Sequence, residues 1–247
     1  MEGVAEEKII EDSVDRYKNK NRRNIFTQQR LVPLQKHLKR GNVLDCGCGV
    51  GVFVKILQDA GYECDGIDLS RKSIEIGEGK LQIKTLKYGD VQSLAREKKQ
   101  YDAVIATTLM EHLEDPSMFL QTISKIIHKD GLLVLEFPTV DSLSFEMLKD
   151  YWYWIMSPYH LFYYSKISID ILLRRHGFRI IDEAPLNPGW MWAESIANSA
   201  GLLVKYNNWR HQDADFVKFS IEIDKIFDKI ALFQKRTSSI QIYARKK

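Results

Sequence analysis

The sequence predicts an α/β fold in which helices cover both faces of a mostly parallel, doubly wound sheet. Apolar runs alternate along the chain with segments of helical periodicity, which is the pattern of successive strand–helix–strand units. Near residue 47, an apolar run, three glycines at alternate positions and a helical pattern follow one another, as expected of a buried strand, a tight turn and a helix. The 247 residues fit one such domain with insertions.

The expected elements follow in order along the chain. Strands are expected near residues 42–45, 63–68, 84–88, 101–106, 131–137, 178–184 and 239–245, and helices near 50–60, 71–79, 116–128 and 166–176. Lys129-Asp130-Gly131 forms a turn that leads into the fifth strand, and Gly177 provides the C-terminal stop of the last of these helices. Apolar and polar residues alternate over Ser238–Arg245, which predicts an edge strand.

The glycine turn predicts a ligand site. Glycines at alternate positions let the backbone lie flat against a ligand, because no Cβ holds it away and positive φ is allowed. A dinucleotide-binding GxGxxG turn would need a third glycine at Val52 or Val54, depending on the register. The chain has DxGxGxG instead, beginning at Asp45. A carboxylate there would repel a pyrophosphate, but it suits a ligand that carries an ammonium and a sulfonium group.

With this turn the chain resembles the class I S-adenosylmethionine (SAM) dependent methyltransferases, which typically have a small residue at the position of Cys48. Three later motifs follow in the family's order: Gly66-Ile67-Asp68-Leu69-Ser70, Gly89-Asp90-Val91 and the segment Thr107–Pro116. The EHLEDP run that ends this segment is typical of small-molecule methyltransferases similar to the ubiquinone-biosynthesis O-methyltransferases. The resemblance implies a Rossmann-like, seven-stranded sheet whose last strand is antiparallel.

The resemblance also implies that SAM is the cofactor. Asp68 would accept hydrogen bonds from both ribose hydroxyls, and the motif at Asp90 would meet the adenine amino group. The full set of cofactor-binding residues that it implies is Asp45, Gly47, Cys48, Gly49, Gly51, Asp68, Leu69, Asp90, Val91 and Thr107.

Three segments lie outside the resembling core. Residues 1–40 have a helical pattern, and in related enzymes such a segment folds over the cofactor site; the methyltransferase domain itself is expected at 41–247, with insertions at 138–165 and 185–237. Ligands bind at the carboxyl ends of strands in open α/β sheets, so insertions there become walls and lids. We expect these segments to encode the identity of the methyl acceptor.

Two of these segments leave alternatives open. The aromatic runs at 151–154 and 158–164 either pack a small helical cap or line a pocket for a flat or lipid-like acceptor, with cation–π contact to the sulfonium. Residues 213–235 have apolar residues at three- and four-residue steps with lysines between them, which predicts an amphipathic helix. Such a helix either covers a core or contacts a membrane surface or a second copy of the chain.

Methyl transfer needs little from the protein beyond alignment, because the methyl carbon is already activated by the positive sulfur. Orientation can supply roughly 7–11 kcal/mol, and a base is needed only when the acceptor is a hydroxyl or a protonated amine. His112, which follows the fourth strand, and His160, in the aromatic segment, are the candidate catalytic residues. The alternative for each is a structural histidine whose hydrogen bonds order a loop.

The sequence predicts no bound metal. Some similar methyltransferases, including small-RNA 2′-O-methyltransferases, hold a divalent cation with an ExxEH motif, which would lower the pKa of the acceptor hydroxyl. The matching residues here are Thr108-Leu109-Met110-Glu111-His112, so the first carboxylate is a threonine. Cys46 and Cys48 have no further ligands at metal-binding spacing.

Composition and missing motifs narrow the acceptor to a small molecule, a sugar or a lipid-linked compound, with oxygen as the expected acceptor atom. A net charge of +3, without a basic tract beyond Lys246-Lys247, argues against nucleic acid. The [ND]PPY run of adenine and glutamine N-methyltransferases is missing. The N-terminus is acidic and no uncharged apolar run reaches about 18 residues, so a cytoplasmic location is expected.

Three other functions stay open. An RNA or protein methyltransferase would have an open, basic cleft and salt-dependent binding to phosphocellulose. A non-catalytic SAM-binding partner subunit would bind SAM but not turn it over. An NAD-linked dehydrogenase is disfavoured by the missing glycine at Val52.

Overall fold

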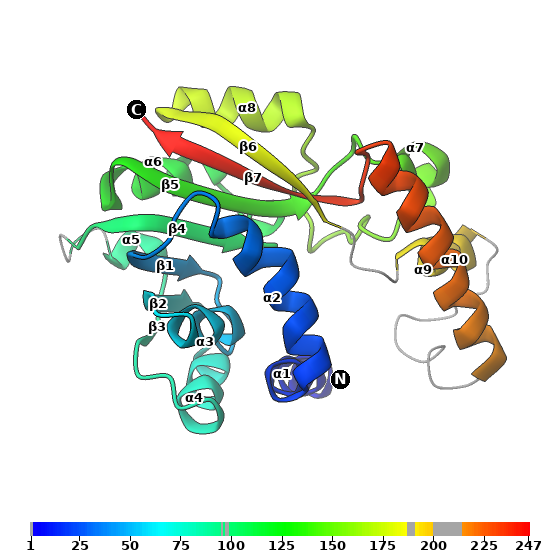
Figure 1. Cartoon of the computed structure of the whole chain (residues 1–247), viewed down its shortest axis with the longest axis horizontal. Coiled ribbons are helices and arrows are strands. Elements are labelled where there is room, and N and C mark those ends of the chain that lie inside the picture. Colours follow the sequence, from blue (N-terminus) through cyan, green and yellow to red (C-terminus); the bar gives the residue numbers. More distant parts are fainter. Residues whose placement is uncertain (1, 95, 97–98, 187–190, 200–213) are drawn as a thin grey trace.

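A computed structural model describes residues 2–94, 96, 99–186, 191–199 and 214–247 (Figure 1). Its centre is one seven-stranded sheet in the order β3-β2-β1-β4-β5-β7-β6. The strands are β1 (Asn42–Cys46), β2 (Glu63–Asp68), β3 (Leu86–Tyr88), β4 (Tyr101–Thr107), β5 (Ile127–Pro138), β6 (Phe178–Leu186) and β7 (Ser239–Lys246). The first five strands pair in parallel, and β7 is antiparallel to both β5 and β6. The predicted fold class is confirmed.

The strand order reverses between β1 and β4. After β1 the chain moves outward through β2 and β3, and it then returns to place β4 on the other side of β1. Cys46 near the end of β1 pairs with Ala106 near the end of β4, so the two strands finish side by side. In open α/β sheets such a reversal leaves a crevice at the carboxyl ends of the strands, where ligands bind.

Helices cover both faces of the sheet because successive residues of its inner strands point to opposite sides. In β1, Val43 packs into the apolar cluster on one face and Leu44 into the cluster on the other. The first face carries α1 (Glu2–Lys18), α2 (Lys20–Leu34), α3 (Val52–Asp59) and α4 (Arg71–Lys80), and the second carries α5 (Val91–Leu94), α6 (Pro116–Ile126) and α8 (Lys166–Arg175). The predicted helices are therefore present within a few residues of their expected bounds.

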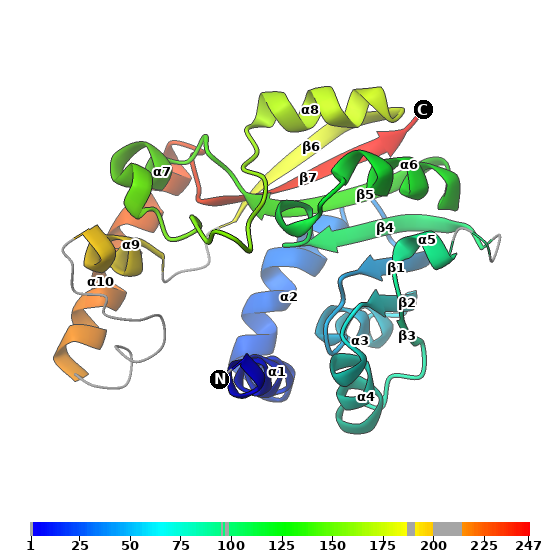
Figure 2. The ribbon, with the colours of Figure 1, turned by 180° about the vertical axis from the view of Figure 1, so that it is seen from behind.

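The two later insertions pack together into one helical appendage beyond the carboxyl ends of β4 and β5 (Figures 1 and 2). It consists of α7 (Leu143–Leu148), the 3-10 turn η2 (Lys149–Tyr151), α9 (Met191–Ser199) and α10 (Ala214–Phe233). The Trp192 and Phe227 rings stack with centroids 4.7 Å apart, and the Tyr153 N–H donates to Ser195 Oγ at 2.9 Å. Segments far apart in the sequence thus form one wall next to the crevice.

The expected amphipathic helix is present as α10, although residues 187–190 and 200–213 of the 185–237 insertion lie outside the described residues. Ile226 and Phe233 of α10 are exposed, so its contact with a membrane surface or a second copy stays a prediction. Among the described helices, none combines the length and apolar character needed to cross a bilayer.

The prediction of an edge strand at the C-terminus is wrong. β7 lies between β5 and β6, and β6 forms the edge of the sheet. The polar residues of β7 face partners instead of water: Gln241 Nε2 donates to Glu136 Oε2 at 2.9 Å, and the Tyr243 hydroxyl donates to Gln241 Oε1 at 2.8 Å. The alternation of polar and apolar residues in β7 therefore reflects a buried polar network and not an exposed face.

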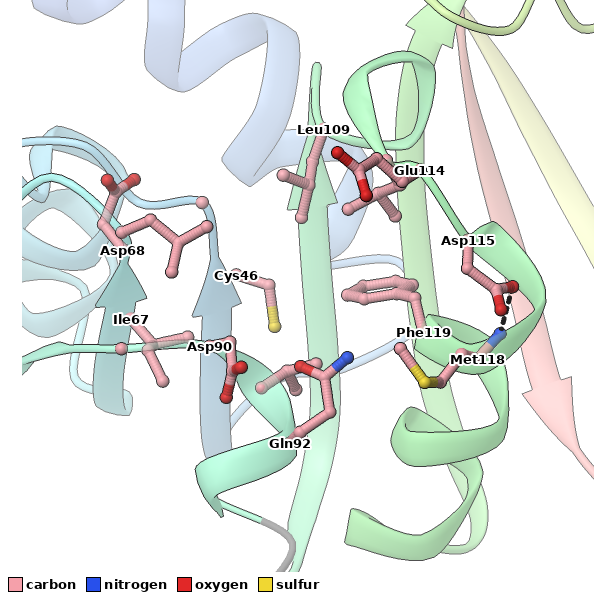
Figure 3. Close-up of a pocket in the computed structure, with 15 residues that line it drawn as sticks. Cys46, Ile67, Asp68, Asp90, Gln92, Leu109, Glu114, Asp115, Met118 and Phe119 are labelled. Atoms are coloured by element: carbon pink, nitrogen blue, oxygen red, sulfur yellow. Dashed lines mark hydrogen bonds between the residues drawn. The ribbon is translucent and has the colours of Figure 1, made fainter.

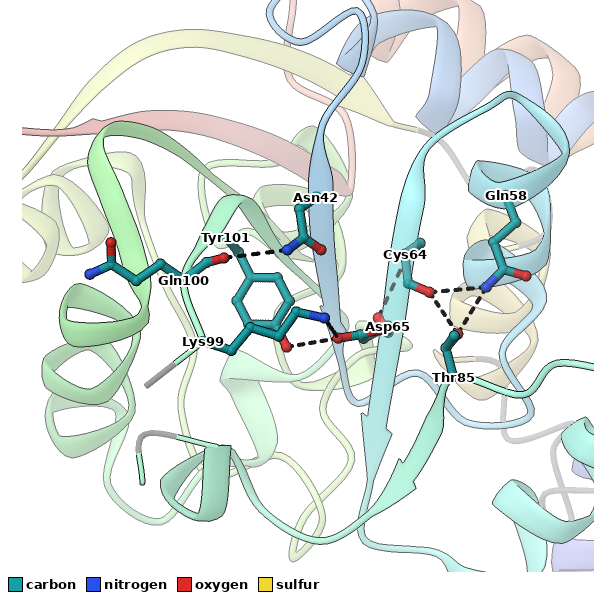
Figure 4. A network of polar contacts seen from close by, with 8 residues as sticks. All are labelled: Asn42, Gln58, Cys64, Asp65, Thr85, Lys99, Gln100 and Tyr101. Atoms are coloured by element: carbon teal, nitrogen blue, oxygen red, sulfur yellow. Dashed lines mark hydrogen bonds and ion pairs between the residues drawn. The ribbon is translucent and has the colours of Figure 1, made fainter. Parts of the chain in front are cut away.

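A second polar network ties the sheet together at the amino ends of its strands (Figure 4). The Tyr101 hydroxyl at the start of β4 donates to Asp65 Oδ2 on β2 at 2.9 Å. Gln58 Nε2 of α3 donates to the Cys64 carbonyl at 3.0 Å and to Thr85 Oγ1 at 2.8 Å. These bonds tie β2 to β4 and to α3, away from the crevice.

Substitutions at two glycines of α4 test how closely this helix packs against the glycine turn. A Cβ at Gly77 would overlap the Val50 carbonyl and lie 2.5 Å from Leu86 Cδ1, whereas at Gly79 it would meet no described atom within 4 Å. We expect Gly77→Ala to lower the free energy of unfolding by about 1–3 kcal/mol through overpacking. The matched control Gly79→Ala should raise it by up to about 1 kcal/mol through helix propensity. Urea unfolding measures both, and equal effects would contradict the close approach.

Candidate functional site

The turn between β1 and α3 is built from three glycines with positive φ. Gly47, Gly49 and Gly51 have φ of 71°, 55° and 81°, a region that residues with a Cβ rarely adopt. At Gly51 a Cβ would lie 2.7 Å from Ile83 Cδ1, so packing also requires glycine there. At Gly49 a Cβ would meet no atom of the described chain within 4 Å. The outer side of Gly49 is therefore open to a ligand.

Asp68, the last residue of β2, holds this turn in place. Its Oδ2 accepts the Gly49 N–H at 2.8 Å and its Oδ1 accepts the Ser70 N–H at 2.8 Å. The Gly47 N–H donates to the Ile67 carbonyl at 2.9 Å. The acidic residue predicted to bind the ribose thus also organises the glycine turn.

A first cavity of about 440 Å³ lies at the carboxyl ends of β1 and β2, between the glycine turn and α6 (Figure 3). Five residues implied by the resemblance line it: Gly47, Asp68, Leu69, Asp90 and Val91. The carboxylates of Asp68 and Asp90 lie on one side, and an apolar wall of Leu109, Leu113, Met118 and Phe119 lies on the other. Sequence reasoning missed this wall, although the apolar residues after the fourth strand were a usable signal.

The other implied residues do not line this cavity. Cys48 packs inside the fold, since a Cβ at Gly66 would lie 2.8 Å from its Sγ. Gly49 and Gly51 shape the turn, and Thr107 ends β4. Asp45 is buried beneath the turn.

Asp45 is the most perturbed acid near the turn. It is 1% exposed, and its Oδ1 has no hydrogen-bond partner among the described residues. Burial raises its pKa to about 8, and the negative charge of Asp68 acts in the same direction, while Arg30 opposes the shift. Arg30 is itself paired with Glu136 on β5, with Nη2 2.5 Å from Oε1. The end of the sheet thus concentrates acidic groups around one arginine.

A second cavity of about 350 Å³ lies between the N-terminal helices and the base of the appendage. Side chains of α1 and α2, including Phe26 and Arg30, line it together with Thr108, Glu136 and Trp154. Thr108 follows β4 and has φ of 48°, which is strained for a β-branched residue. Its N–H donates to the Glu136 carbonyl at 2.8 Å. Thr108 lines this cavity and Leu109, the next residue, lines the first, so the segment that follows β4 borders both cavities.

The structure brings the two candidate catalytic histidines together. The rings of His112 and His160 have centroids 4.7 Å apart. The Nδ1 of His112 lies 2.9 Å from the Tyr159 carbonyl, and the Nδ1 of His160 lies 2.8 Å from the Trp154 carbonyl. A carbonyl can only accept, so each Nδ1 carries a hydrogen, and in the neutral form of the ring Nε2 keeps its lone pair. Burial, and then the charge of His112, lower the pKa of His160.

Glu111 lies beside these histidines, which sequence reasoning did not foresee. It is 1% exposed, and neither carboxylate oxygen has a partner within the described part of the chain. Burial raises its pKa to about 8. Its carbonyl accepts the Leu161 N–H at 2.7 Å, which joins the 3-10 turn η1 (Met110–His112) to the segment that carries His160. This backbone hydrogen bond between distant segments leaves no local sequence signal.

Comparison with known proteins places the chain among methyltransferases. Residues 17–183 match the sequence family described as a methyltransferase domain. A ubiquinone biosynthesis O-methyltransferase of Pelagibacter ubique (strain HTCC1062) is 30% identical over 115 residues, which are 45% of this chain and 48% of that protein. The chain covers about half the length of the curated relatives that it matches.

Solved structures share the fold. A SAM-dependent methyltransferase from Archaeoglobus fulgidus has a TM-score of 0.59 at 21% identity, with 91% of this chain and 94% of that chain covered. The magnesium protoporphyrin IX methyltransferase from Synechocystis PCC 6803 with bound SAM has a TM-score of 0.52 at 16% identity, with coverage of 91% and 78%. At sequence identities this low, the similarity to these structures establishes the fold alone.

The buried carboxyl of Asp45 predicts a pH-dependent stability. Its pKa of about 8 in the folded chain exceeds the value of about 3.9 expected after unfolding. The folded state therefore binds its proton more tightly, and the stability that this proton contributes is lost as pH rises from about 4 to about 8. Asp45→Asn, a neutral isostere, should match the wild type near pH 4 and exceed it by at least about 1 kcal/mol above pH 8. Urea unfolding across this range tests the difference, and parallel profiles would contradict it.

Proposed function

Because the chain belongs to the methyltransferase domain family and uses SAM as its methyl donor, we propose that it methylates an oxygen atom of a small-molecule acceptor. The observation that carries the proposal is that the consecutive residues Thr108 and Leu109, directly after β4, line one cavity each. The donor occupies the first cavity and the acceptor the second. The methyl group passes between them near Thr108.

The first cavity has the chemistry of the donor. Asp68 and Asp90 offer carboxylates for the ribose hydroxyls and the adenine amino group, while exposed Leu69 and the apolar wall suit the two faces of a flat ring. Gly47 lines the cavity, and the open side of Gly49, two residues further on, leaves room for the methionine portion of SAM to extend over the turn. Asp45 does not line the cavity, but its unpartnered Oδ1 beneath the turn would favour a ligand that brings an ammonium group to the turn.

The second cavity suits an acceptor with an aromatic or other flat group. Phe26 and Trp154 supply ring faces, and Arg22 and Arg30 lie at its border. Both arginines are paired with acids, Arg22 with Asp12 and Arg30 with Glu136, so the lining is polar without being strongly basic. Residues 1–40 were expected to fold over the cofactor site, but they line this second cavity and not the first, so we assign them to covering the acceptor and 41–247 to the methyltransferase domain. A sugar or lipid-linked acceptor enters by the same opening.

The reaction follows from alignment and one proton transfer. The acceptor oxygen attacks the methyl carbon while the carbon–sulfur bond breaks, and its electron pair goes to sulfur to give S-adenosylhomocysteine. The hydroxyl proton must leave, and the Nε2 lone pairs of His112 and His160 are available to receive it. His160 stacks with Trp154, its centroid 5.8 Å away, and Trp154 lines the second cavity. On this geometry the histidines are the catalytic residues.

Labelling identifies the acceptor and tests the role of the histidines. The full chain is incubated with methyl-tritiated SAM and a panel of phenolic, sugar and prenylated alcohols, and products are identified by mass spectrometry. We expect the label on oxygen, with His112→Ala and His160→Ala each at least about tenfold slower at unchanged SAM affinity. His128→Ala, an exposed histidine elsewhere, is the matched control. Label on nitrogen, on RNA or on no acceptor would overturn the proposal.

The open side of Gly49 predicts a selective loss of SAM affinity. Gly49 and Gly61 both have positive φ and room for a Cβ, but Gly61 lies at the amino end of β2, away from both cavities. Replacing either with alanine introduces similar backbone strain of about 1–2 kcal/mol. Only Gly49→Ala places a methyl group where the donor lies, so isothermal titration should show SAM binding at least about tenfold weaker, or 1.4 kcal/mol. Equal SAM affinity in the two variants would contradict the assignment.

A further inference from the structure

We propose that Glu111, His112 and His160 form a binding site for a divalent first-row transition-metal ion, next to Trp154, which lines the second cavity. Each residue offers one ligand atom, and these atoms all lie within 4.8 Å of one another. Metal–ligand distances of about 2.0–2.2 Å imply ligand atoms roughly 3.4 Å apart around a tetrahedral ion. Closure by up to about 1.4 Å is needed, which requires a shift of the exposed His112 side chain.

The histidines are already oriented as metal ligands are. A ligating histidine donates its other ring N–H to a carbonyl or carboxylate, which fixes the tautomer and the ring. Both histidines do this, since each Nδ1–H meets a backbone carbonyl within 2.9 Å. In the neutral form of each ring the Nε2 lone pair would then be available, and one ring nitrogen of each histidine lies within 4.8 Å of the other ligand atoms.

Glu111 supplies the second, independent observation. Its carboxylate is almost fully buried, and neither oxygen has a hydrogen-bond partner among the residues that the structure describes. A buried polar group without a hydrogen-bond partner destabilises a fold, and such groups are therefore usually hydrogen-bonded. The neighbouring Tyr164 hydroxyl donates to the Met110 carbonyl and not to this carboxylate. A cation held between Glu111 and the histidines would satisfy it.

Backbone hydrogen bonds hold the three ligands in one place. The Glu111 carbonyl accepts the N–H groups of Leu161 and Phe162, at 2.7 and 3.3 Å, directly after His160. His160 thereby takes the place of the carboxylate that Thr108 lacks in the ExxEH comparison. The prediction of no bound metal considered ligands on one segment, whereas the site proposed here joins two segments.

The ligand set favours some metals over others. Two imidazole nitrogens and one carboxylate suit zinc, iron, cobalt or manganese, whereas magnesium and calcium prefer oxygen ligands. Three protein ligands also leave at least one position open, as in catalytic zinc sites. The acceptor oxygen can fill that position.

The catalytic consequence rests on the proposed function. An acceptor hydroxyl bound to the cation would have a lowered pKa and release its proton to water. Its oxygen then forms the bond to the methyl carbon as the carbon–sulfur bond breaks and the electron pair goes to sulfur. With the cation bound, the two histidines would be its ligands and water would receive the proton, whereas without the cation the histidines receive the proton as in the proposed function.

Cobalt(II) tests the site directly. The full chain, treated with a chelator and dialysed, is titrated with Co²⁺ and followed by visible absorption and calorimetry. We expect one equivalent to bind, and Glu111→Gln, His112→Gln and His160→Gln each to weaken binding at least about tenfold. His128→Gln, on an exposed histidine outside the cluster, should bind Co²⁺ as the wild type does.

SAM affinity in the same samples separates this inference from the proposed function. A variant that keeps wild-type SAM affinity is folded, and its loss of Co²⁺ binding then supports the site; exposed His112 provides a variant that does not disturb the core. No Co²⁺ binding by the wild type at millimolar concentration, or equal binding by wild type and all three cluster variants, would overturn the metal site. A chain that binds Co²⁺ but not SAM would overturn the proposed function and leave the metal site standing.

Discussion

The carboxyl edge of the sheet depends on one contact, the hydrogen bond from the Gly49 N–H to the Asp68 carboxylate. It joins the ends of β1 and β2 and holds three residues in a conformation that only glycine adopts without strain. The helix α3 begins directly after this turn and packs back on the sheet. This turn forms one side of the first cavity. The residues that follow neighbouring strands supply its carboxylates, and α6 supplies part of its apolar wall.

Sequence periodicity predicted the fold well where burial alone set the pattern. Uninterrupted apolar runs such as Val43-Leu44 and Val104-Ile105 belong to strands that are buried on both faces, and all seven strands were predicted. The predicted start of β5 was wrong, because this strand begins at Ile127 and includes the residues predicted to form a turn at 129–131. The position of β7 was not predictable in this way. Gln241 alternates with apolar neighbours because it pairs with Glu136, and a pattern of residue types cannot distinguish a buried polar partner from water.

The candidate site likewise has one part that the sequence could predict and one part that it could not. Gly47, Asp68, Leu69, Asp90 and Val91 follow strand ends, and their placement around one cavity is a consequence of parallel topology that a sequence can reveal. The union of Glu111, His112 and His160 is different, since it depends on backbone hydrogen bonds between η1 and a loop of the appendage. The second cavity likewise needs α2, Thr108 and Trp154, which come from three distant segments. Such contacts depend on the packing of distant segments, which the local sequence does not predict.

The charges at this edge suggest why the site would need cations. Asp45, Glu111 and Glu136 are each 1% exposed, while Arg30 is the cation that pairs with one of them in the described structure. Buried carboxylates repel one another and are costly to ionise without partners. A ligand with an ammonium and a sulfonium group near Asp45 and a divalent ion at Glu111 would each offset one of these charges. Burial of these acids without partners raises the free energy of the folded chain, and a cationic ligand would recover part of that free energy when it binds. A neutral ligand of the same shape would not.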